Sequence, residues 1–153
     1  MISLNSIEIQ QYEQNRFPYL LIDRITHIIP GEYAFGYKNF TSNEWFFSIH
    51  FKDDPMVPAA LLQESLTQTA ALIILTMPGN KGKVMYMTEV SNAKFRRKVI
   101  PGDRFDIETK VIKWNRGMGK FEGKGFVQGM PICSASFSLV LPDELNKFKV
   151  KEE

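Results

Sequence analysis

Residues 59–77 form the longest apolar run in the chain, and the other segments are arranged around it. Pro58 suits the first position of a helix, where its missing N–H costs nothing, and Pro78 and Gly79 stop the run. The polar residues within it are Gln63, Glu64, Ser65, Thr67, Gln68 and Thr69. So many polar groups are improbable in a membrane span, so the pattern predicts a buried core helix from Pro58 to Met77.

Segments rich in β-branched and aromatic residues lie on both sides of this helix. Before it, residues 20–29 and 33–40 are separated by Pro30-Gly31-Glu32, a type II turn signal. After it, further strands are predicted at residues 83–90, 94–100, 105–115, 120–128 and 131–141. A long central helix with an antiparallel series of strands predicts an α+β domain whose sheet curls around the helix.

The two ends of the chain carry weaker patterns. The first fifteen residues mix polar and apolar positions, and fit either a short amphipathic helix or an irregular strand. The charged residues 147–153 are expected to fray. A length of 153 residues suits one domain with a real core, so residues 1–153 are predicted to form a single domain.

Composition adds constraints on location and partners. The chain is 44% apolar and 24% charged with a formal net charge of +2, which is too mild to indicate nucleic-acid binding. A single cysteine, Cys133, excludes an internal disulfide and suits a reducing compartment, and we interpret it as a small apolar residue in a strand. The N-terminus lacks a basic flank followed by an apolar run, so we expect no targeting segment and a cytoplasmic protein.

Two chemical motifs are incomplete. The glycines at 117, 119, 123 and 125 miss the GxGxxG spacing of a nucleotide loop by one residue, and they lie between predicted strands. Two histidines and one cysteine are scattered without metal-ligand spacing. We therefore expect a glycine-rich hairpin, no metal site, and a structural role for His27 inside the first strand.

His50 and Glu64 are the candidates for chemistry. His50 has apolar neighbours at a predicted strand end, and a proline-bounded turn leads from it to the helix that carries Glu64 as its single acid. Gln68, at i+4, lies on the same helical face as Glu64. Burial favours the neutral form of each group, so an imidazole base and a carboxylic acid could together remove a proton and expel a hydroxyl.

The start of the same helix offers a second kind of chemistry. Free backbone N–H groups and the positive end of the helix dipole, near Val57 to Ala60, could polarise a carbonyl. On the residues alone, a structural histidine and a solvated glutamate stay open as the alternative.

Several blocks of the sequence occur in an order and spacing typical of a known enzyme family. They are residues 16–24, 38–41, 43–47, 50–51, 55–58, 63–68 and 94–103. From about residue 16 to 141 the chain resembles the FabZ-type 3-hydroxyacyl-acyl carrier protein dehydratases, members of the hotdog-fold superfamily. The resemblance implies a hotdog fold and dehydration of a (3R)-hydroxyacyl thioester on acyl carrier protein to the trans-2-enoyl thioester, in fatty-acid or related acyl-chain biosynthesis.

The resemblance also implies roles for particular residues. His50 takes the proton from the carbon next to the thioester carbonyl, Glu64 protonates the departing 3-hydroxyl, and the backbone N–H of Ala59 holds the thioester oxygen. Gln68 supports the acid, and Tyr86 lines or gates the acyl tunnel. The implied substrate-binding residues are Val57, Ala59, Gln68, Tyr86 and Phe95. Relatives that also isomerise the double bond usually have aspartate at the position of the acid. The glutamate at position 64 therefore implies dehydration without isomerisation.

The implied partners are a second copy of the chain and acyl carrier protein. In this family the histidine and glutamate of one site come from two protomers, so a dimer is implied, often assembled into a hexamer as a trimer of dimers. No metal or organic cofactor is implied. The basic cluster, defined as Lys94, Arg96, Arg97 and Lys98, lies on a predicted strand and its end and could steer an acidic carrier protein. A solvated charged face is the alternative.

Four residues, at three places in the chain, depart from the family pattern. Ile49 stands in place of the glycine before the histidine, Lys52-Asp53 in place of Pro-Gly, and Ala59 in place of the glycine after the second proline. Ile49 and Ala59 add side chains where substrate would approach, which predicts a shorter or unusual acyl chain or a specialised pathway. A hotdog acyl-thioesterase and a non-catalytic acyl-thioester-binding module stay open, as does coenzyme A in place of the carrier protein.

Overall fold

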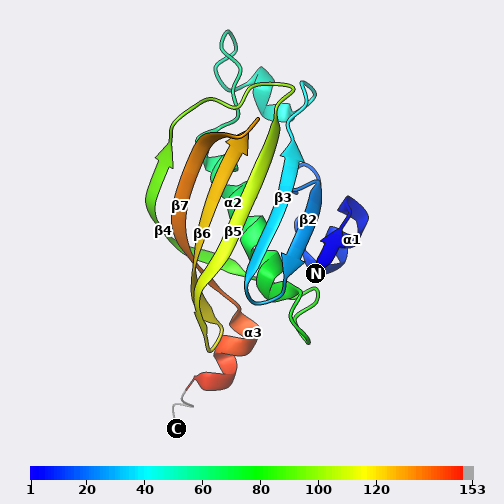
Figure 1. Ribbon diagram of the computed structural model, residues 1–153, viewed down its shortest axis with the longest axis vertical. Helices are drawn as coiled ribbons and strands as arrows, with labels where there is room; N and C mark the ends of the chain where they lie inside the picture. Colours follow the sequence, from blue (N-terminus) through cyan, green and yellow to red (C-terminus); the bar gives the residue numbers. More distant parts are fainter. Residues whose placement is uncertain (150–153) are drawn as a thin grey trace.

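In the computed structural model, which describes residues 1–149, a seven-stranded antiparallel sheet curls around one long helix (Figure 1). The strand order β1-β2-β3-β5-β6-β7-β4 puts β1 and β4 at the two edges. The strands are β1 (Ile2–Leu4), β2 (Arg24–Ile29), β3 (Tyr33–Asn39), β4 (Tyr86–Phe95), β5 (Arg104–Asn115), β6 (Met118–Val127) and β7 (Met130–Val140). The helices are α1 (Ser6–Tyr12), α2 (Ala59–Leu75), α3 (Pro142–Leu145) and the 3-10 helices η1 (Trp45–Ser48) and η2 (Asn146–Phe148). The predicted α+β hotdog arrangement is confirmed.

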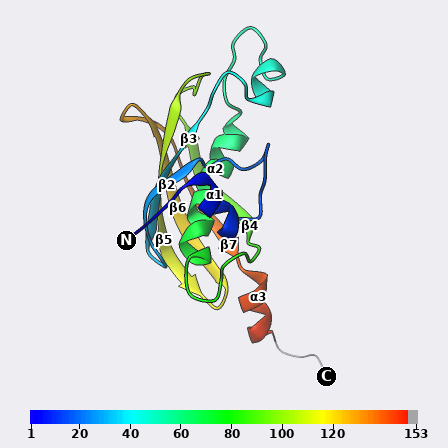
Figure 2. The same cartoon turned by 90° about the vertical axis from the view of Figure 1, so that its right-hand side faces the viewer.

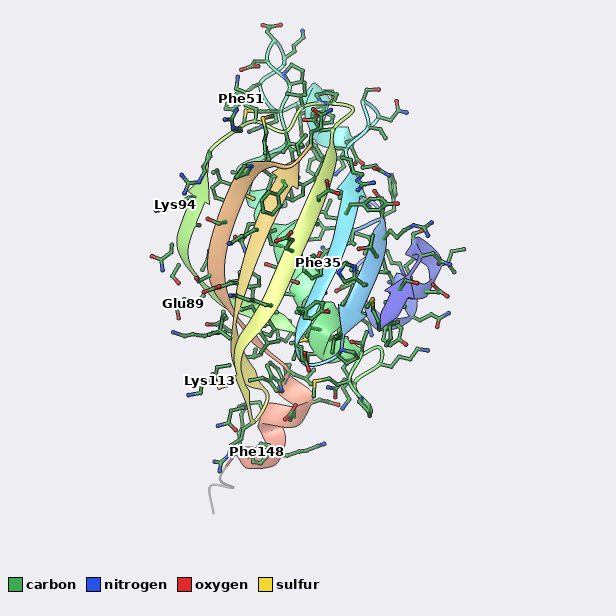
Figure 3. The ribbon with its side chains drawn as sticks, viewed as in Figure 1. Phe35, Phe51, Glu89, Lys94, Lys113 and Phe148 are labelled. Atoms are coloured by element: carbon green, nitrogen blue, oxygen red, sulfur yellow. The ribbon has the colours of Figure 1, made fainter. Side chains whose placement is uncertain are left out.

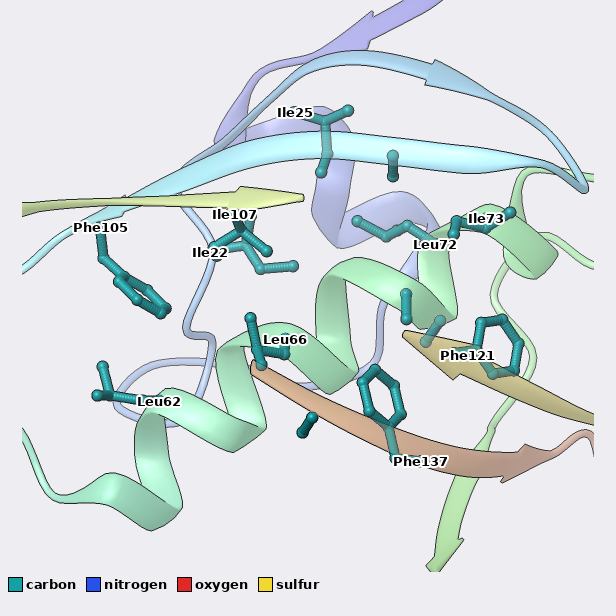
Figure 4. Close-up of a cluster of buried hydrophobic side chains, with 14 of the residues drawn as sticks. Ile22, Ile25, Leu62, Leu66, Leu72, Ile73, Phe105, Ile107, Phe121 and Phe137 are labelled. Carbon is teal, nitrogen blue, oxygen red and sulfur yellow. The ribbon is translucent and has the colours of Figure 1, made fainter. Parts of the chain in front are cut away.

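The central helix α2 is buried along most of its length because apolar residues occupy all of its faces. Leu66 is fully buried and belongs to one core cluster with Phe121 and Phe137 of the sheet (Figure 4). The sheet lies close to the helix at Gly123, where an added Cβ would lie 3.2 Å from Leu66. The prediction of a core helix is therefore confirmed, although α2 begins at Ala59 and ends at Leu75, inside the predicted bounds.

The N-terminus contains both of the structures that its pattern allows. Strand β1 is followed by α1, which starts at a capping box: the Asn5 side chain accepts the Glu8 N–H at 2.9 Å, and the Asn5 N–H donates to the Glu8 carboxylate at 2.8 Å. Ile9 of α1 is fully buried in the core. Figure 2 shows α1 on the same side of the sheet as α2, and Figure 1 places it beside β2 near the edge of the sheet.

Strand β4 takes the place of two predicted strands, at residues 83–90 and 94–100. Its register against β7 shifts between Ser91 and Lys94, and Asn92 takes a φ of 51°. Asparagine tolerates this left-handed conformation better than most residues, so a bulge lets one strand continue through a polar stretch. The prediction of a separate strand at 94–100 is wrong, since residues 96–100 lie in a loop.

The segment before α2 also differs from its prediction. Instead of a strand ending at His50, the chain forms η1 and then a bend. Phe46 and Phe47 are adjacent and both buried, with ring centroids 4.8 Å apart. A strand would point adjacent side chains to opposite faces, whereas the 3-10 turn of η1 buries both rings in contact with each other.

Smaller features follow the sequence more closely. Gly31 has a φ of 80°, as the predicted type II turn requires, and buried Cys133 lies in β7, where burial raises the pKa of its thiol to about 12. His27 stacks on Phe35 with ring centroids 4.4 Å apart, which fits a structural role. Lys147 and Phe148, in the tail predicted to fray, belong to η2, whereas residues 150–153 lie outside the described residues. No helix within residues 1–149 is long and apolar enough to cross a membrane.

Candidate active site

His50 lies in the loop after η1 and is half-buried, not enclosed as predicted. Its Nδ1 lies 3.1 Å from the backbone oxygen of Met56, and its ring packs on Phe51 with centroids 4.3 Å apart. A carbonyl oxygen only accepts, so this contact requires the proton on Nδ1. In the neutral imidazole Nε2 is then the free acceptor, which is the form that a base needs.

Glu64 projects from the second turn of α2 and is also half-buried. Its Oε1 accepts a hydrogen bond from Gln68 Nε2 at 2.9 Å. Burial raises the pKa of the Glu64 carboxyl, the hydrogen bond from Gln68 opposes this, and the negative charge of Glu13 raises the pKa further. The predicted direction is confirmed, so this carboxyl holds its proton to higher pH than an exposed glutamate.

Gln68 joins Glu64 to the chain before β2. Its Oε1 accepts the N–H of Leu21 at 2.8 Å, and its Nε2 donates to the backbone oxygen of Tyr19 at 2.8 Å as well as to Glu64. The side chain is 2% exposed. With both ends of the amide satisfied by fixed partners, its orientation is unambiguous, and the carboxyl of Glu64 is held in one position.

The start of α2 has the expected free N–H groups. Pro58 is the N-cap, and its carbonyl accepts from Leu61 and Leu62, while the N–H of Ala59 has no backbone acceptor among residues 1–149. Val57 is fully buried, and its N–H donates to the Val99 oxygen at 2.8 Å, which anchors the loop just before the helix. The helix start thus offers the free N–H that the predicted binding of a carbonyl oxygen requires.

The single chain does not bring His50 and Glu64 together. Within residues 1–149 no hydrogen bond or ion pair links the two side chains, and each has its own partners. Neither side chain lines any of five surface clefts found among the described residues. The His50 loop, marked by Phe51, projects at the end of the molecule opposite Phe148 (Figure 3).

The two aromatic residues predicted to bind substrate are also separated. Tyr86 and Phe95 are the first and last residues of β4, and they are 57% and 41% exposed. All ten residues of this edge strand are exposed. Tyr86 is therefore a surface residue of the single chain, and its role at an acyl tunnel stays a prediction.

The basic cluster lies at the surface close to the His50 loop. Lys94 is in β4, but Arg96, Arg97 and Lys98 follow the strand in a loop, so their predicted position on a strand is wrong. Lys98 forms an ion pair with Asp54, which lies four residues after His50. Figure 3 shows Lys94 toward the same end of the molecule as Phe51.

A further cation beside this cluster was missed by the sequence reasoning. Lys124 of β6 and Arg96 line one cleft, together with Phe126 and Pro131. Lys124 alternates with glycines in its strand, and only the sheet register brings it next to Arg96.

Two residues of the acid site were missed as well. Glu13, at the end of α1, is 7% exposed, and its charge acts on Glu64. The pKa of the Tyr19 hydroxyl is raised, first by burial and then by the charge of Glu64. Neither residue has a local signal that points to Glu64, because only the packing of the N-terminal segment on α2 brings them near it.

Comparison with known proteins assigns the chain to a family. The sequence model of the FabA-like domain matches residues 14–136. The chain belongs to the FabA-like family. It is 42% identical over 144 residues to "3-hydroxyacyl-[acyl-carrier-protein] dehydratase FabZ" of Alkaliphilus metalliredigens, covering 93% of this chain and 98% of that protein. A protein of the same name from Clostridium novyi is 42% identical over 121 residues, which cover 78% of this chain and 85% of the relative.

Solved structures share the fold of this FabA-like chain. The dehydratase heterocomplex ApeI:P from Xenorhabdus doucetiae matches with a TM-score of 0.77 and 12% identity, over 91% of this chain and 95% of that chain. A hypothetical thioesterase protein with coenzyme A from Streptococcus pneumoniae matches with a TM-score of 0.61 and 13% identity, over 76% and 83% of the two chains. At such identities the likeness supports the fold and does not separate the two activities.

Proposed function

We propose that this FabA-like protein is a hydro-lyase that converts a (3R)-hydroxyacyl thioester on acyl carrier protein to the trans-2-enoyl thioester and water. The match to a relative named 3-hydroxyacyl-[acyl-carrier-protein] dehydratase, 42% identical over 98% of its length, carries the proposal. The site supports it, because it offers an imidazole with a free nitrogen and a carboxyl with a raised pKa.

The base of the proposed reaction is His50. Its Nε2 takes a proton from the carbon next to the thioester carbonyl, while Nδ1–H stays on the Met56 oxygen and fixes the ring. Negative charge then develops on the thioester oxygen. The Ala59 N–H and the N-terminal end of α2 are placed to stabilise that charge.

The acid is Glu64. Its protonated carboxyl gives a proton to the 3-hydroxyl, the C3–O bond breaks, and water leaves as the C2–C3 double bond forms. Glu64 ends as a carboxylate and His50 as an imidazolium, and proton exchange with solvent resets both groups. Gln68 holds the carboxyl in place during this transfer.

Two copies of the chain complete the site in this proposal. Base and acid are unconnected in one chain, and β4 presents an edge with Tyr86, Met87, Val90 and Phe95 exposed. Unpaired edge strands with apolar side chains are suited to pairing with another chain. We infer a dimer in which His50 of one copy faces Glu64 of the other, and predict a trimer of dimers as the larger assembly. The cytoplasmic location stays a prediction.

Mixing two inactive variants tests this arrangement. His50→Ala and Glu64→Gln are each expected to lose activity, but a heterodimer of the two has one intact site if base and acid come from different chains. An equal mixture refolded together should recover about a quarter of wild-type activity by random pairing. No recovery, with heterodimers present by native mass spectrometry, would place both groups of a site in the same chain.

The reaction itself is tested by enoyl-thioester absorbance. Wild-type protein should form the trans-2-enoyl product from 3-hydroxyacyl substrates, and a series of chain lengths tests the predicted effect of Ile49 and Ala59. A thiol reagent added to the same assay detects release of free thiol, as a thioesterase would give. A flat absorbance trace at every chain length would favour the non-catalytic binding module.

We further propose that the basic cluster and Lys124 receive the acidic carrier protein. Lys98 pairs with Asp54, four residues after His50, and Lys124 shares a cleft with Arg96, so a carrier bound there could deliver its acyl chain to the site. Reversing both Arg96 and Arg97 to glutamate should raise KM for carrier-bound substrate without changing KM for a short pantetheine analogue. Equal effects on the two substrates would contradict the docking role and leave coenzyme A thioesters as candidates.

A further inference from the structure

The second-to-last residue of β3 is a lysine that faces the core. Lys38 alternates along the strand with Ala34 and Gly36, which are buried, and its own side chain is only 10% exposed. A buried ammonium costs free energy unless it is paired. Two carboxylates pair with it, Glu44 Oε1 at 2.9 Å and Asp23 Oδ2 at 3.4 Å from the Lys38 Nζ. Lys38 is therefore the centre of a three-residue ionic cluster at one end of the sheet.

Glu44 is the residue from which η1 starts, and η1 leads to the proposed base. The Glu44 carboxylate makes no capping hydrogen bond to η1 and accepts from Lys38 instead. The Glu44 backbone oxygen accepts the Phe47 N–H at 3.3 Å, and the His50 N–H donates to the Phe46 oxygen at 2.9 Å. A continuous series of contacts thus runs from Lys38 through η1 to the backbone of His50.

The second carboxylate holds Lys38 to its own strand. Asp23 Oδ2 accepts the Asn39 N–H at 2.6 Å, and the Asp23 N–H donates to the Tyr37 oxygen at 2.9 Å. These contacts reach the residues on either side of Lys38, so Asp23 is fixed relative to the strand that carries the lysine. The ammonium therefore lies between a carboxylate bound to the sheet and a carboxylate at the start of η1.

Apolar packing alone does not set the position of η1 as closely. Phe46 and Phe47 are buried and stabilise η1 against the core, but hydrophobic contact has no preferred direction. The contact between the Lys38 ammonium and the Glu44 carboxylate is a charge-assisted hydrogen bond, which is directional. A buried ion pair often adds little stability over apolar side chains of the same volume. We therefore interpret this pair as fixing a position more than as adding stability.

We propose that Lys38 is a positioning residue for the base: its ammonium holds Glu44 and, through η1, sets the place of the His50 imidazole. Ile49 and Phe51, on either side of His50, are exposed and do not anchor the base in the core. Proton removal requires close approach of base and carbon, and a misplacement of about 1 Å can cost about a hundredfold in rate. The inference rests on the proposed role of His50 as the base.

Steady-state kinetics of the dimeric protein give the first test. Lys38→Met keeps the length of the side chain but removes its charge. It should lower kcat about tenfold or more and change KM by less than about twofold, because the base is misplaced and the substrate-binding groups are not. Lys38→Arg keeps the charge and should recover most of the lost kcat. Lys110→Met is the matched control, since it removes a lysine from an exposed ion pair with Glu122, and should leave kcat unchanged.

Trp45 gives a direct readout of η1, because it is the first residue of that helix and follows Glu44. The chain has two tryptophans, so Trp45 is the only one in a Trp114→Phe background. In that background Lys38→Met should increase the fast component of the time-resolved fluorescence anisotropy, as η1 gains mobility, and Lys110→Met should not. Loss of kcat with unchanged Trp45 anisotropy would overturn the inference, as would wild-type kcat in folded Lys38→Met.

The outcomes separate this inference from the proposed function. Increased Trp45 motion in Lys38→Met of a protein without dehydratase activity supports the anchoring of η1 and overturns the proposed function. If Lys38→Met does not fold, Glu44→Gln decides, because it keeps the size of the side chain and an acceptor for Lys38 but removes the charge. It should show the same two changes to a smaller extent, and wild-type kcat and anisotropy in folded Glu44→Gln overturn the inference.

Discussion

His50 and Glu64 are the two halves of the proposed site, and their surroundings are opposite. His50 lies in a loop at one end of the molecule, where its neighbours Ile49 and Phe51 are 71% and 62% exposed. Glu64 lies on the core helix, and its partner Gln68 is fixed at both ends of its amide. The acid is thus preorganised by one chain, whereas the base needs a further surface to enclose it. We infer that association of two chains encloses His50 in its loop and leaves the surroundings of Glu64 on α2 little changed.

Truncation of one apolar side chain in each region gives the largest contrast. Leu66→Ala leaves a cavity between α2 and the sheet and should lower the free energy of unfolding by about 2–5 kcal/mol. Ile49→Ala should change it by no more than about 0.5 kcal/mol, because the side chain is exposed. Urea unfolding measures both. A similar loss for both variants would show that the loop is buried in the assembled protein.

Removal of the Gln68 amide should have the next largest effect. Gln68→Ala leaves the buried N–H of Leu21 without its acceptor and should cost about 1–3 kcal/mol of unfolding free energy. Gln63→Ala is the matched control on the same helix, since the buried Oε1 of Gln63 has no hydrogen-bond partner among residues 1–149. The control should lose less stability. Equal losses of unfolding free energy in the two variants would mean that the Gln68 hydrogen bonds do not hold α2 and Glu64 in place.

The pH dependence of stability tests the surroundings of Glu64. The pKa of Glu64 is raised in the folded chain above the ordinary value of 4.5, so the folded state binds more protons between the two values. Stability contributed by this group is present below the ordinary pKa and is lost as the pH rises through the folded pKa. The Glu64→Gln variant should lack the loss of stability that wild type shows as the pH rises through the Glu64 pKa. Urea unfolding midpoints measured across the pH range test this. An unaltered profile would contradict a raised Glu64 pKa.

The smallest effect is expected at the surface ion pair beside the loop. Lys98 and Asp54 are both exposed, so Lys98→Ala should change the unfolding free energy by about 0–1 kcal/mol, and less at high salt. A clear loss in thermal unfolding at low salt, reproduced by Asp54→Ala, would instead assign the pair a role in holding the His50 loop.

Local signals explain which parts of the fold were predictable. The helix from Ala59 to Leu75 follows from an apolar run between prolines, and the turn at Gly31 follows from a residue pair that favours a positive φ. The η1 turn and the bulge at Asn92 were not predictable in the same way. The η1 turn goes with the burial of both Phe46 and Phe47, and the bulge goes with the register between β4 and β7; a sequence pattern shows neither.

The candidate site likewise has features that the sequence predicts and features that it does not. His50, Glu64 and Gln68 could be selected from the sequence because each stands out against its neighbours in the chain. Glu64 is the single acid on an apolar helix, Gln68 follows it by four positions, and His50 lies near a proline turn. Tertiary packing alone decided that Glu13 and Tyr19 lie near Glu64, that His50 is half-buried, and that base and acid are separate within one chain. These features depend on distances between segments remote in sequence, which are set by how α1, the loop before β2 and α2 share the core.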